Sequence, residues 1–250
     1  MILAFDTASA LTSVAVVDGD SVVVERAHLD ARRHAEVMAP LLAEVIDGVP
    51  PAGFTAIACG VGPGPYTGLR VGIATALAVG AAWQLPVHGL CSLDAVAAAA
   101  LALGRSDTDD GVCVALDARR KEVYWARYDL DGTRVDGPRV ASPHAIDRAL
   151  RSRTWAGHGA VLHADDFARL IVDPVDQADT VSASMYPRAG WIGRRVAQLL
   201  ATGETDTPTA APLDAHGDDS GATANALHGA ALLSPRPLYL RRPDVTVAGP

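Results

Sequence analysis

Residues 1–19, MILAFDTASALTSVAVVDG, contain the pattern from which the fold can be predicted. Two apolar runs of strand length, MILAFDT and SVAVVDG, flank a small polar turn, which is the signature of a β-hairpin. The pattern recurs in VCVALDA at 112–118 and EVYWARYD at 122–129, again as strand, aspartate, polar turn and strand. The repetition predicts two similar halves, each opening on a hairpin whose first strand ends near an aspartate.

Strands and helices alternate through the rest of the chain. Further strands are predicted at 21–27 and 55–62, which are apolar runs of strand length. Helices are predicted over six ranges, namely 33–47, 66–83, 93–103, 143–152, 164–171 and 187–202. Strands that alternate with helices predict an α/β fold, and the two hairpins indicate a duplicated unit with a cleft between its halves.

The chain is expected to divide into four parts. Residues 1–104 should form an N-terminal subdomain and residues 105–202 a C-terminal one. Residues 203–234 contain five acidic residues and no Lys or Arg, so we expect a mobile acidic tail or loop there. Residues 235–250 begin with an apolar segment, PLYLRRPDVTV from position 237, that should dock on the body of the protein.

Composition limits the classes of function. The net charge of −8 does not favour unaided binding of nucleic acid, because contacts to phosphates need clustered Lys and Arg. Residues 71–93 carry no charge over 23 positions, a length that could span a bilayer, but Pro86 should end the helix. We therefore expect a buried helix in a soluble protein, with no membrane partner. The N-terminus lacks a basic flank, so we expect no signal peptide and a cytoplasmic location.

The glycine-rich stretch GVGPGPYTGLRVG, residues 60–72, raises the question of phosphate binding. It contains neither the G-x-x-x-x-G-K-[ST] motif of a P-loop nor the G-x-G-x-x-G fingerprint of a dinucleotide site. Two interpretations stay open: backbone N–H groups at a helix start that hold an anion, or a tight turn that needs glycine beside a closely packed helix.

The helix predicted at 66–83 has an unusual surface. Gly68, Gly72, Ala76 and Gly80 fall four residues apart, and no charged residue follows Arg70 until the helix has ended. A helix that is apolar on every side must be covered on every side. Together with the broad apolar face of helix 33–47, it forms a candidate protein–protein interface, although an entirely intramolecular core of three layers is the alternative. The candidate interface residues are Val37, Met38, Leu41, Leu42, Val45, Gly72, Ile73, Ala76 and Gly80.

Several segments together resemble one family. ILAFDTASALTSVAVV, HAEVMAPLL, GVGPGPYTGLRVGIATALAVG, LPVHGLCSLDAVA, LDARRKEVYWARY and PLYLRRPD are similar to the TsaB (YeaZ) family, a bacterial subunit of the machinery that makes threonylcarbamoyladenosine in tRNA. The resemblance is loose over 140–185 and nearly absent over 203–234. It implies an actin-like, Hsp70-like ATPase (ASKHA) fold of two subdomains.

The resemblance also implies partners. The paralogue TsaD would carry the catalytic metal and transfer the threonylcarbamoyl group to N6 of the adenosine 3′ of the anticodon, in tRNAs that read ANN codons. A third protein, the ATPase TsaE, would act with the pair, so that ATP is used by the complex and tRNA is reached only through it. The paralogues would form a heterodimer through helices of their N-terminal subdomains. Whether the isolated chain forms a homodimer is left open.

Catalytic residues are not expected in this chain. The resemblance aligns Ser92 and Val96 with the two histidines that hold the metal in the paralogue, and neither pair member here is a suitable ligand. The H-E-x-x-H motif of zinc proteases and the G-x-S-x-G motif of serine hydrolases are both absent from the sequence. We expect no catalytic metal and no cofactor on the isolated chain.

A nucleotide cleft is expected only as an inherited feature. The resemblance places Asp6, Thr7, Ser9 and Asp117 where the actin-like fold holds phosphates and a metal. The adenosine-binding segment of that fold usually has paired glycines, and this chain has no Gly-Gly. The one basic cluster, ARRKE at 118–122, is interpreted as either a solvated hairpin tip or a contact to tRNA or the partner.

The sequence leaves three classes of function open. A non-catalytic partner subunit is favoured. A stand-alone ATPase or kinase of actin-like fold is the first alternative, and ATP turnover by the purified chain would reveal it. A glycoprotease-like peptidase is the second alternative, and inhibition by serine reagents or chelators would reveal it.

Overall fold

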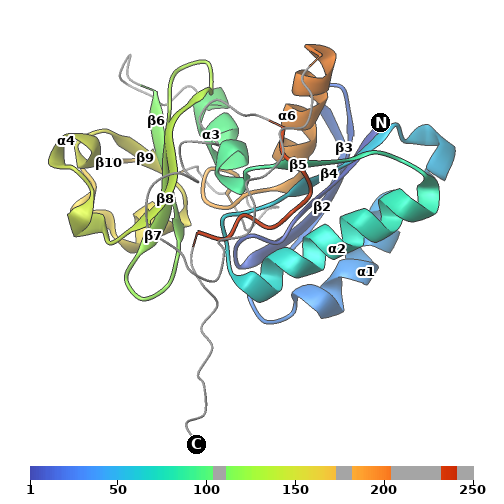
Figure 1. Cartoon of the computed structure of the whole chain (residues 1–250), viewed down its shortest axis with the longest axis horizontal. Helices are drawn as coiled ribbons and strands as arrows, with labels where there is room; N and C mark the ends of the chain where they lie inside the picture. The colour runs from blue at the N-terminus through green and yellow to red at the C-terminus, as the bar shows by residue number, and fades with distance from the viewer. Residues whose placement is uncertain (104–110, 173–181, 204–231, 241–250) are drawn as a thin grey trace, which may run out of the picture.

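The computed structural model describes residues 1–103, 111–172, 182–203 and 232–240, which form two five-stranded mixed sheets with helices around them (Figure 1). The first sheet has the order β3-β2-β1-β4-β5. Its strands are β1 (Ile2–Asp6), β2 (Leu11–Asp18), β3 (Ser21–Leu29), β4 (Ala56–Gly60) and β5 (Val87–Leu90). The second sheet has the order β10-β9-β6-β7-β8. Its strands are β6 (Val112–Asp117), β7 (Val123–Tyr128), β8 (Arg134–Ala141), β9 (Thr154–Ala156) and β10 (Arg169–Leu170).

The two sheets repeat one topology. In the first, β1 pairs antiparallel with β2 and parallel with β4; in the second, β6 pairs antiparallel with β7 and parallel with β9. Each sheet therefore opens on a hairpin that continues into a third antiparallel strand, and the remaining two strands are added on the other side. The prediction of two similar halves, each opening on a β-hairpin, is confirmed.

The first sheet is the middle of three layers. On one face lie α1 (His34–Ile46) and α2 (Tyr66–Trp83), which pack on Leu3, Phe5 and Ile57. The opposite face, with Ala4 and Val17, is covered by α6 (Ala189–Ala201) (Figure 1). Strand β1 is consequently buried on both faces, as its apolar run 2–5 requires. Helix α3 (Ser92–Ala102) packs between α6 and the second sheet.

Helix α6 lies within the range 187–202 predicted for it. It packs on the first sheet, however, although it was predicted to belong to the C-terminal subdomain, residues 105–202. Its N-terminus is capped by side chains of that sheet: the backbone N–H of Ala189 donates to Ser13, and that of Gly190 donates to Glu25. Arg188 adds an ion pair with Glu25 at 2.9 Å. These contacts satisfy N–H groups that have no acceptor inside the helix, and they fix α6 to the first half of the chain.

Two helices expected in the second half are wrong in extent or type. The range 143–152 contains a 3₁₀ turn at Pro143–Ala145 and a short helix α4 (Arg148–Arg151), because Asp147 accepts the N–H of Ala149 and starts a new helix there. The range 164–171 contains a 3₁₀ turn, Ala164–Asp166, followed by strand β10. Its apolar residues enter the second sheet instead of forming a helical face, as short apolar runs can do. A further short helix, α5 (His158–Leu162), and a 3₁₀ turn, Pro51–Gly53, complete the described elements.

The segment 232–240 returns to the first sheet. Leu233 and Gly89 exchange both backbone hydrogen bonds, and the N–H of Leu238 donates to the carbonyl of Val61 at 2.8 Å. Tyr239 then stacks on Tyr66 at the start of α2, with ring centroids 4.9 Å apart. The expected acidic tail lies almost wholly at 204–231, and the end of the expected docking segment at 241–250, both outside the described residues. In the described part of the chain, no helix combines the length and the apolar character needed to cross a bilayer.

Candidate functional site

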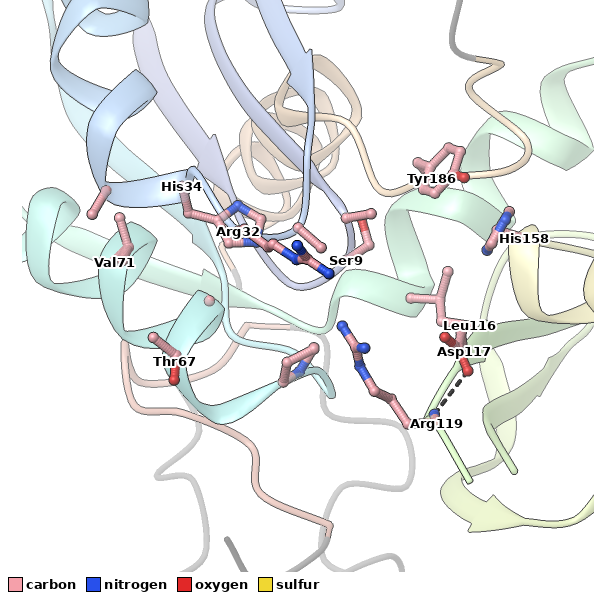
Figure 2. Close-up of a pocket in the computed structure, with 15 residues that line it drawn as sticks. Ser9, Arg32, His34, Thr67, Val71, Leu116, Asp117, Arg119, His158 and Tyr186 are labelled. Carbon is pink, nitrogen blue, oxygen red and sulfur yellow. Dashed lines mark hydrogen bonds between the residues drawn. The ribbon is translucent and has the colours of Figure 1, made fainter. Parts of the chain in front are cut away.

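A cleft of about 310 Å³ lies between the two halves of the molecule (Figure 2). One wall comes from the first half: the turn after β1, the residues that lead into α1, and the first turn of α2. The other wall comes from the end of β6, the start of α5 and the segment before α6. The polar and aromatic lining residues are Ser9, Arg32, His34, Thr67, Asp117, Arg119, His158 and Tyr186.

Of the four residues expected at a nucleotide cleft, two line the cleft and two are buried behind it. Ser9 and Asp117 line the cleft from opposite walls. Asp6 and Thr7 are completely buried behind it. The Thr7 hydroxyl donates to the carbonyl of Gly68 at 2.7 Å and accepts the N–H of Gly72 at 3.1 Å, so it joins the end of β1 to the first turns of α2. Thr7 thus has a structural role in this conformation.

The carboxyl group of Asp6 is also held by hydrogen bonds inside the protein. Its Oδ1 accepts the N–H of Ala8 at 2.8 Å, and its Oδ2 accepts the Ser92 hydroxyl at 2.6 Å. Burial raises the pKa of this carboxyl to about 7, against the smaller opposing effect of the two hydrogen bonds. Asp6 is therefore held away from the cleft and is protonated in part near neutral pH.

The glycine-rich loop packs on this same aspartate. A Cβ at Gly60 would collide with the Asp6 carboxylate and lie 2.7 Å from the Ser92 hydroxyl oxygen. The N–H of Gly62 donates to that hydroxyl oxygen at 3.2 Å. Of the two interpretations of the loop, these contacts favour the tight turn beside a closely packed helix.

The cleft contains side chains that sequence reasoning did not select. His34 bonds through Nδ1 to the Thr12 hydroxyl at 2.7 Å, and His158 stacks on Tyr186 with ring centroids 4.9 Å apart. Burial lowers the pKa of both histidines, so both are mainly neutral at pH 7. The internal duplication was the available signal: α5 follows β9 in the second half as α2 follows β4 in the first, so its first residue was a candidate for the cleft.

A second surface is formed by α1 and α2, which lie together on the side of the first sheet opposite α6 (Figure 1). The structure places the nine candidate interface residues differently. Six face the interior of the chain, namely Met38, Val45, Gly72, Ile73, Ala76 and Gly80. Three are half-buried, namely Val37, Leu41 and Leu42.

The glycine and alanine stripe of α2 is filled by the chain itself. A Cβ at Gly72 would lie 2.5 Å from the Thr7 hydroxyl, and one at Gly80 would collide with Val87 of β5. Ala76 between them is fully buried. The expectation that a partner helix packs on this stripe is wrong for these positions, because the missing side chains let α2 approach its own sheet.

The solvent-facing side of α2 carries another apolar stripe. It consists of Ala74, Leu77, Ala78 and Ala81, and Leu77 is 43% exposed. On α1 the exposed positions include Ala39 and Ala43. We call these six residues the outer helix face. The signal was present in the sequence, since 74, 77, 78 and 81 have helical spacing on the side opposite the glycines.

Comparisons with known proteins identify the family. Residues 26–159, more than half of the chain, match the model of the family described as TsaD: tRNA N6-adenosine threonylcarbamoyltransferase. An uncharacterized Mycobacterium tuberculosis protein, Rv3421c, is 42% identical over 177 residues, covering 69% of this chain and 78% of the relative. The Escherichia coli tRNA threonylcarbamoyladenosine biosynthesis protein TsaB is 36% identical over 132 residues. The structure of YeaZ from Pseudomonas aeruginosa superimposes with a TM-score of 0.62 at 29% identity, covering 81% of this chain and 92% of that one.

The chain belongs to the TsaB (YeaZ) family. Its two similar sheets around a cleft are the actin-like fold that the resemblance implied. The match to the E. coli TsaB covers 52% of this chain and 55% of that protein, and the match to the uncharacterized Mycobacterium leprae protein ML0378 covers 47% of that relative. The chain therefore spans about half the length of some of the relatives it matches.

The described residues of this TsaB-family chain contain few groups that could bind a metal ion. Within residues 1–103, 111–172, 182–203 and 232–240, no three His, Cys, Asp or Glu side chains are grouped so that they could hold one. Ser92 and Val96, which the resemblance aligns with the metal-binding histidines of TsaD, are fully buried. Ser92 is occupied by its bonds to Asp6 and Gly62, and Val96 belongs to the hydrophobic core.

Proposed function

We propose that this chain is a non-catalytic subunit of the machinery that makes threonylcarbamoyladenosine in tRNA, and that it acts by binding a TsaD-type paralogue. The observation that carries the proposal is the similarity to proteins named TsaB, at 36% identity for the E. coli protein and 35% for the Haemophilus influenzae one. The environment of Ser92 supports the non-catalytic role, because its hydroxyl is committed to Asp6 inside the protein.

The paralogue docks on the outer helix face. This surface is apolar and uncharged, with Leu77 at its centre on α2 and Ala39 and Ala43 on α1. Small side chains on both helices allow two further helices to approach closely, and the exposed Leu77 would be desolvated there. Glu36, Glu44 and Arg70 lie exposed on the same two helices and would form a polar rim.

Other components act through this pair. The ATPase TsaE completes the complex and ATP is used there, while tRNA is held by the complex as a whole, in the cytoplasm. The net charge of −8 supports binding of tRNA by the complex and not by this chain alone. A chain with few clustered cations gains little binding energy from phosphate contacts of its own. Without its partner, the chain can cover the same apolar face by pairing with a second copy.

The experiment is co-purification of the tagged chain with the TsaD paralogue, followed by a tRNA modification assay. We expect a stable complex, and threonylcarbamoyladenosine in digested tRNA only when the chain, the paralogue and TsaE are all present. Full modification without the chain, or failure of the two proteins to associate, would refute the proposal. ATP turnover by the purified chain alone would favour the stand-alone ATPase instead.

A further inference from the structure

Helix α3 is bonded to the second sheet through one side chain in its first turn. Oδ1 of Asp94 accepts the hydroxyl of Tyr128, on β7, at 2.7 Å. Nη1 of Arg134, the first residue of β8, forms an ion pair with the same oxygen at 3.5 Å. Burial raises the pKa of Tyr128, so the phenol stays protonated and can donate to the carboxylate. Asp94 therefore fixes the start of α3 to the second sheet, while Ser92 fixes it to Asp6 of the first sheet.

These charged groups lie inside the protein. The side chains of Asp94 and Arg134 are 10% and 3% exposed, and Tyr128 is fully buried. A buried pair is screened little by salt, and separating its members would leave two charges desolvated without a counter-ion. A movement of α3 relative to the second sheet is thus opposed by electrostatics as well as by packing.

One hydrophobic core extends through both sheets. The same cluster contains Leu3 and Phe5 of the first sheet and Val112 and Val114 of the second. Helix α3 lies beside the second sheet (Figure 1) and contributes to this cluster the side chains of Leu93, Val96, Ala97 and Ala100. Because protein interiors are packed as densely as organic crystals, rotating one sheet relative to the other would lose contacts throughout this core.

A second connection lies in the segment before α6. The N–H of Gly157, at the start of α5, donates to the carbonyl of Ser184 at 2.7 Å. Two residues later, Tyr186 packs on Leu11 of β2 in the first sheet. Rotation of the halves about α3 would break these contacts, and rotation about this segment would break those of Asp94. The two connections together leave no single hinge.

Proteins that bind a ligand between two domains commonly close around it by rotation about a few hinge residues. We infer that α3 locks the two halves of this chain into one rigid unit, so that the cleft between them keeps a fixed width. A ligand or partner then meets a surface that is already formed, and binding does not require the halves to move. The inference concerns the isolated chain and does not rest on the proposed function.

Spin labels on the two halves test the inference. They are attached to cysteines introduced by Asp47→Cys, just after α1, and Ala149→Cys, on α4, which are both exposed positions. The three native cysteines are buried, so they do not react in the folded chain. We expect pulsed electron paramagnetic resonance to give one narrow distance distribution, whose mean shifts by less than about 2 Å when excess magnesium ATP is added. Two separate distances, or a larger shift, would overturn the inference.

Variants of the labelled chain test the role of α3 itself. Asp94→Ala removes the acceptor of both Tyr128 and Arg134, and should broaden the distance distribution by about twofold or more, because the buried arginine loses its counter-ion. Tyr128→Phe keeps the ion pair and should broaden the distribution less. Asp165→Ala removes an exposed carboxylate from the second half and, as the matched control, should leave the distribution unchanged.

Near-ultraviolet circular dichroism shows which variants are folded, and Tyr128→Phe serves if Asp94→Ala is not. Distributions as narrow as that of the wild type in the folded variants would show that α3 is not the lock. Hydrogen exchange of the wild type in increasing urea adds a measurement without labels. Locked halves should open as one unit, so amides of β1 and β6 should exchange with the same free energy of opening. Exchange of β6 that stays more than about tenfold faster than that of β1 would also overturn the inference.

Discussion

The Ser92 hydroxyl donates a 2.6 Å hydrogen bond to Oδ2 of Asp6, and this bond joins the first residue of α3 to the last residue of β1. The same hydroxyl oxygen accepts the N–H of Gly62, so three segments that are distant in sequence meet at one oxygen atom. All three groups are buried. Ser92 therefore acts as a structural joint at the position that the resemblance aligns with a metal ligand of TsaD.

Ser92→Ala should lower the free energy of unfolding by about 1–3 kcal/mol, because it leaves the Asp6 carboxyl and the Gly62 N–H buried without their partner. Urea denaturation measures the loss. The control is Ser21→Ala, which removes a hydroxyl from an exposed position at the start of β3 and should change stability by less than about 0.5 kcal/mol. Equal losses in the two variants would show that the hydrogen bonds of Ser92 contribute nothing to the free energy of unfolding.

Asp6 should make the stability of the chain depend on pH between about 4 and 7. Its folded-state pKa of about 7 lies above the unfolded value of 3.8, so within this window the folded chain binds more protons than the unfolded chain. The contribution of Asp6 is therefore largest at low pH and is lost as the pH rises to 7, by roughly a few kcal/mol in total.

The variant Asp6→Asn isolates this effect. Its amide can accept from Ala8 and donate to Ser92, as the protonated carboxyl can, but it does not titrate. We expect the difference in unfolding free energy, wild type minus variant, to fall steadily between pH 4 and pH 7 and to level off above. A difference that stays constant, or that increases with pH, would contradict the raised pKa.

Ala76→Leu should destabilise the isolated chain. Ala76 is fully buried between α2 and the first sheet, so three added carbon atoms have no free space and overpacking should cost about 1–3 kcal/mol. Thermal unfolding followed by circular dichroism measures the change. If the stability of the chain alone is unchanged and only partner binding is lost, the stripe of small residues faces a partner after all.

Leu77→Glu, one residue further along α2, should leave the stability of the isolated chain nearly unchanged but weaken binding of the partner. Leu77 is 43% exposed, so a charge there remains solvated and the stability of the chain should stay within about 0.5 kcal/mol of wild type. Binding of the TsaD paralogue should weaken by about tenfold or more, because the carboxylate would be desolvated in the interface. Size-exclusion chromatography with the partner measures this. Unchanged affinity would place the docking surface elsewhere, and Leu162→Glu, at an exposed leucine of α5, provides the control.

Most of the first half of the fold could be predicted because its elements are long and regular, but the four-residue strand β5 was not predicted. The range 66–83 coincides with α2, which ends three residues before Pro86, a residue that prevents its continuation. In the second half, β9 has three residues and β10 has two, which is too short to show any periodicity. Strand β8 contains Gly137 and Pro138, residues that indicate a turn, and so it was missed.

The candidate site was only partly predictable. The resemblance selected Ser9 and Asp117, which line the cleft from opposite walls, but it also selected Asp6 and Thr7, which face the interior. Arg32 and Tyr186 lie in unrelated segments, and only the packing of the two halves brings them together. The stripe on α2 shows the same limit: spacing tells which residues share a helix face, but it does not tell which neighbour covers that face.

The placement of α6 also determines when the first half can fold during synthesis. The face of the first sheet that carries Ala4 and Val17 is covered by residues that leave the ribosome roughly 140 positions after β4 is complete. At a translation rate of about 5–20 residues per second, this apolar surface stays exposed for roughly 7 to 30 seconds before α6 is synthesised. The growing chain thus exposes an apolar sheet face that can aggregate for most of its translation. A protein truncated before Ala189 would be expected to aggregate or to remain bound to chaperones.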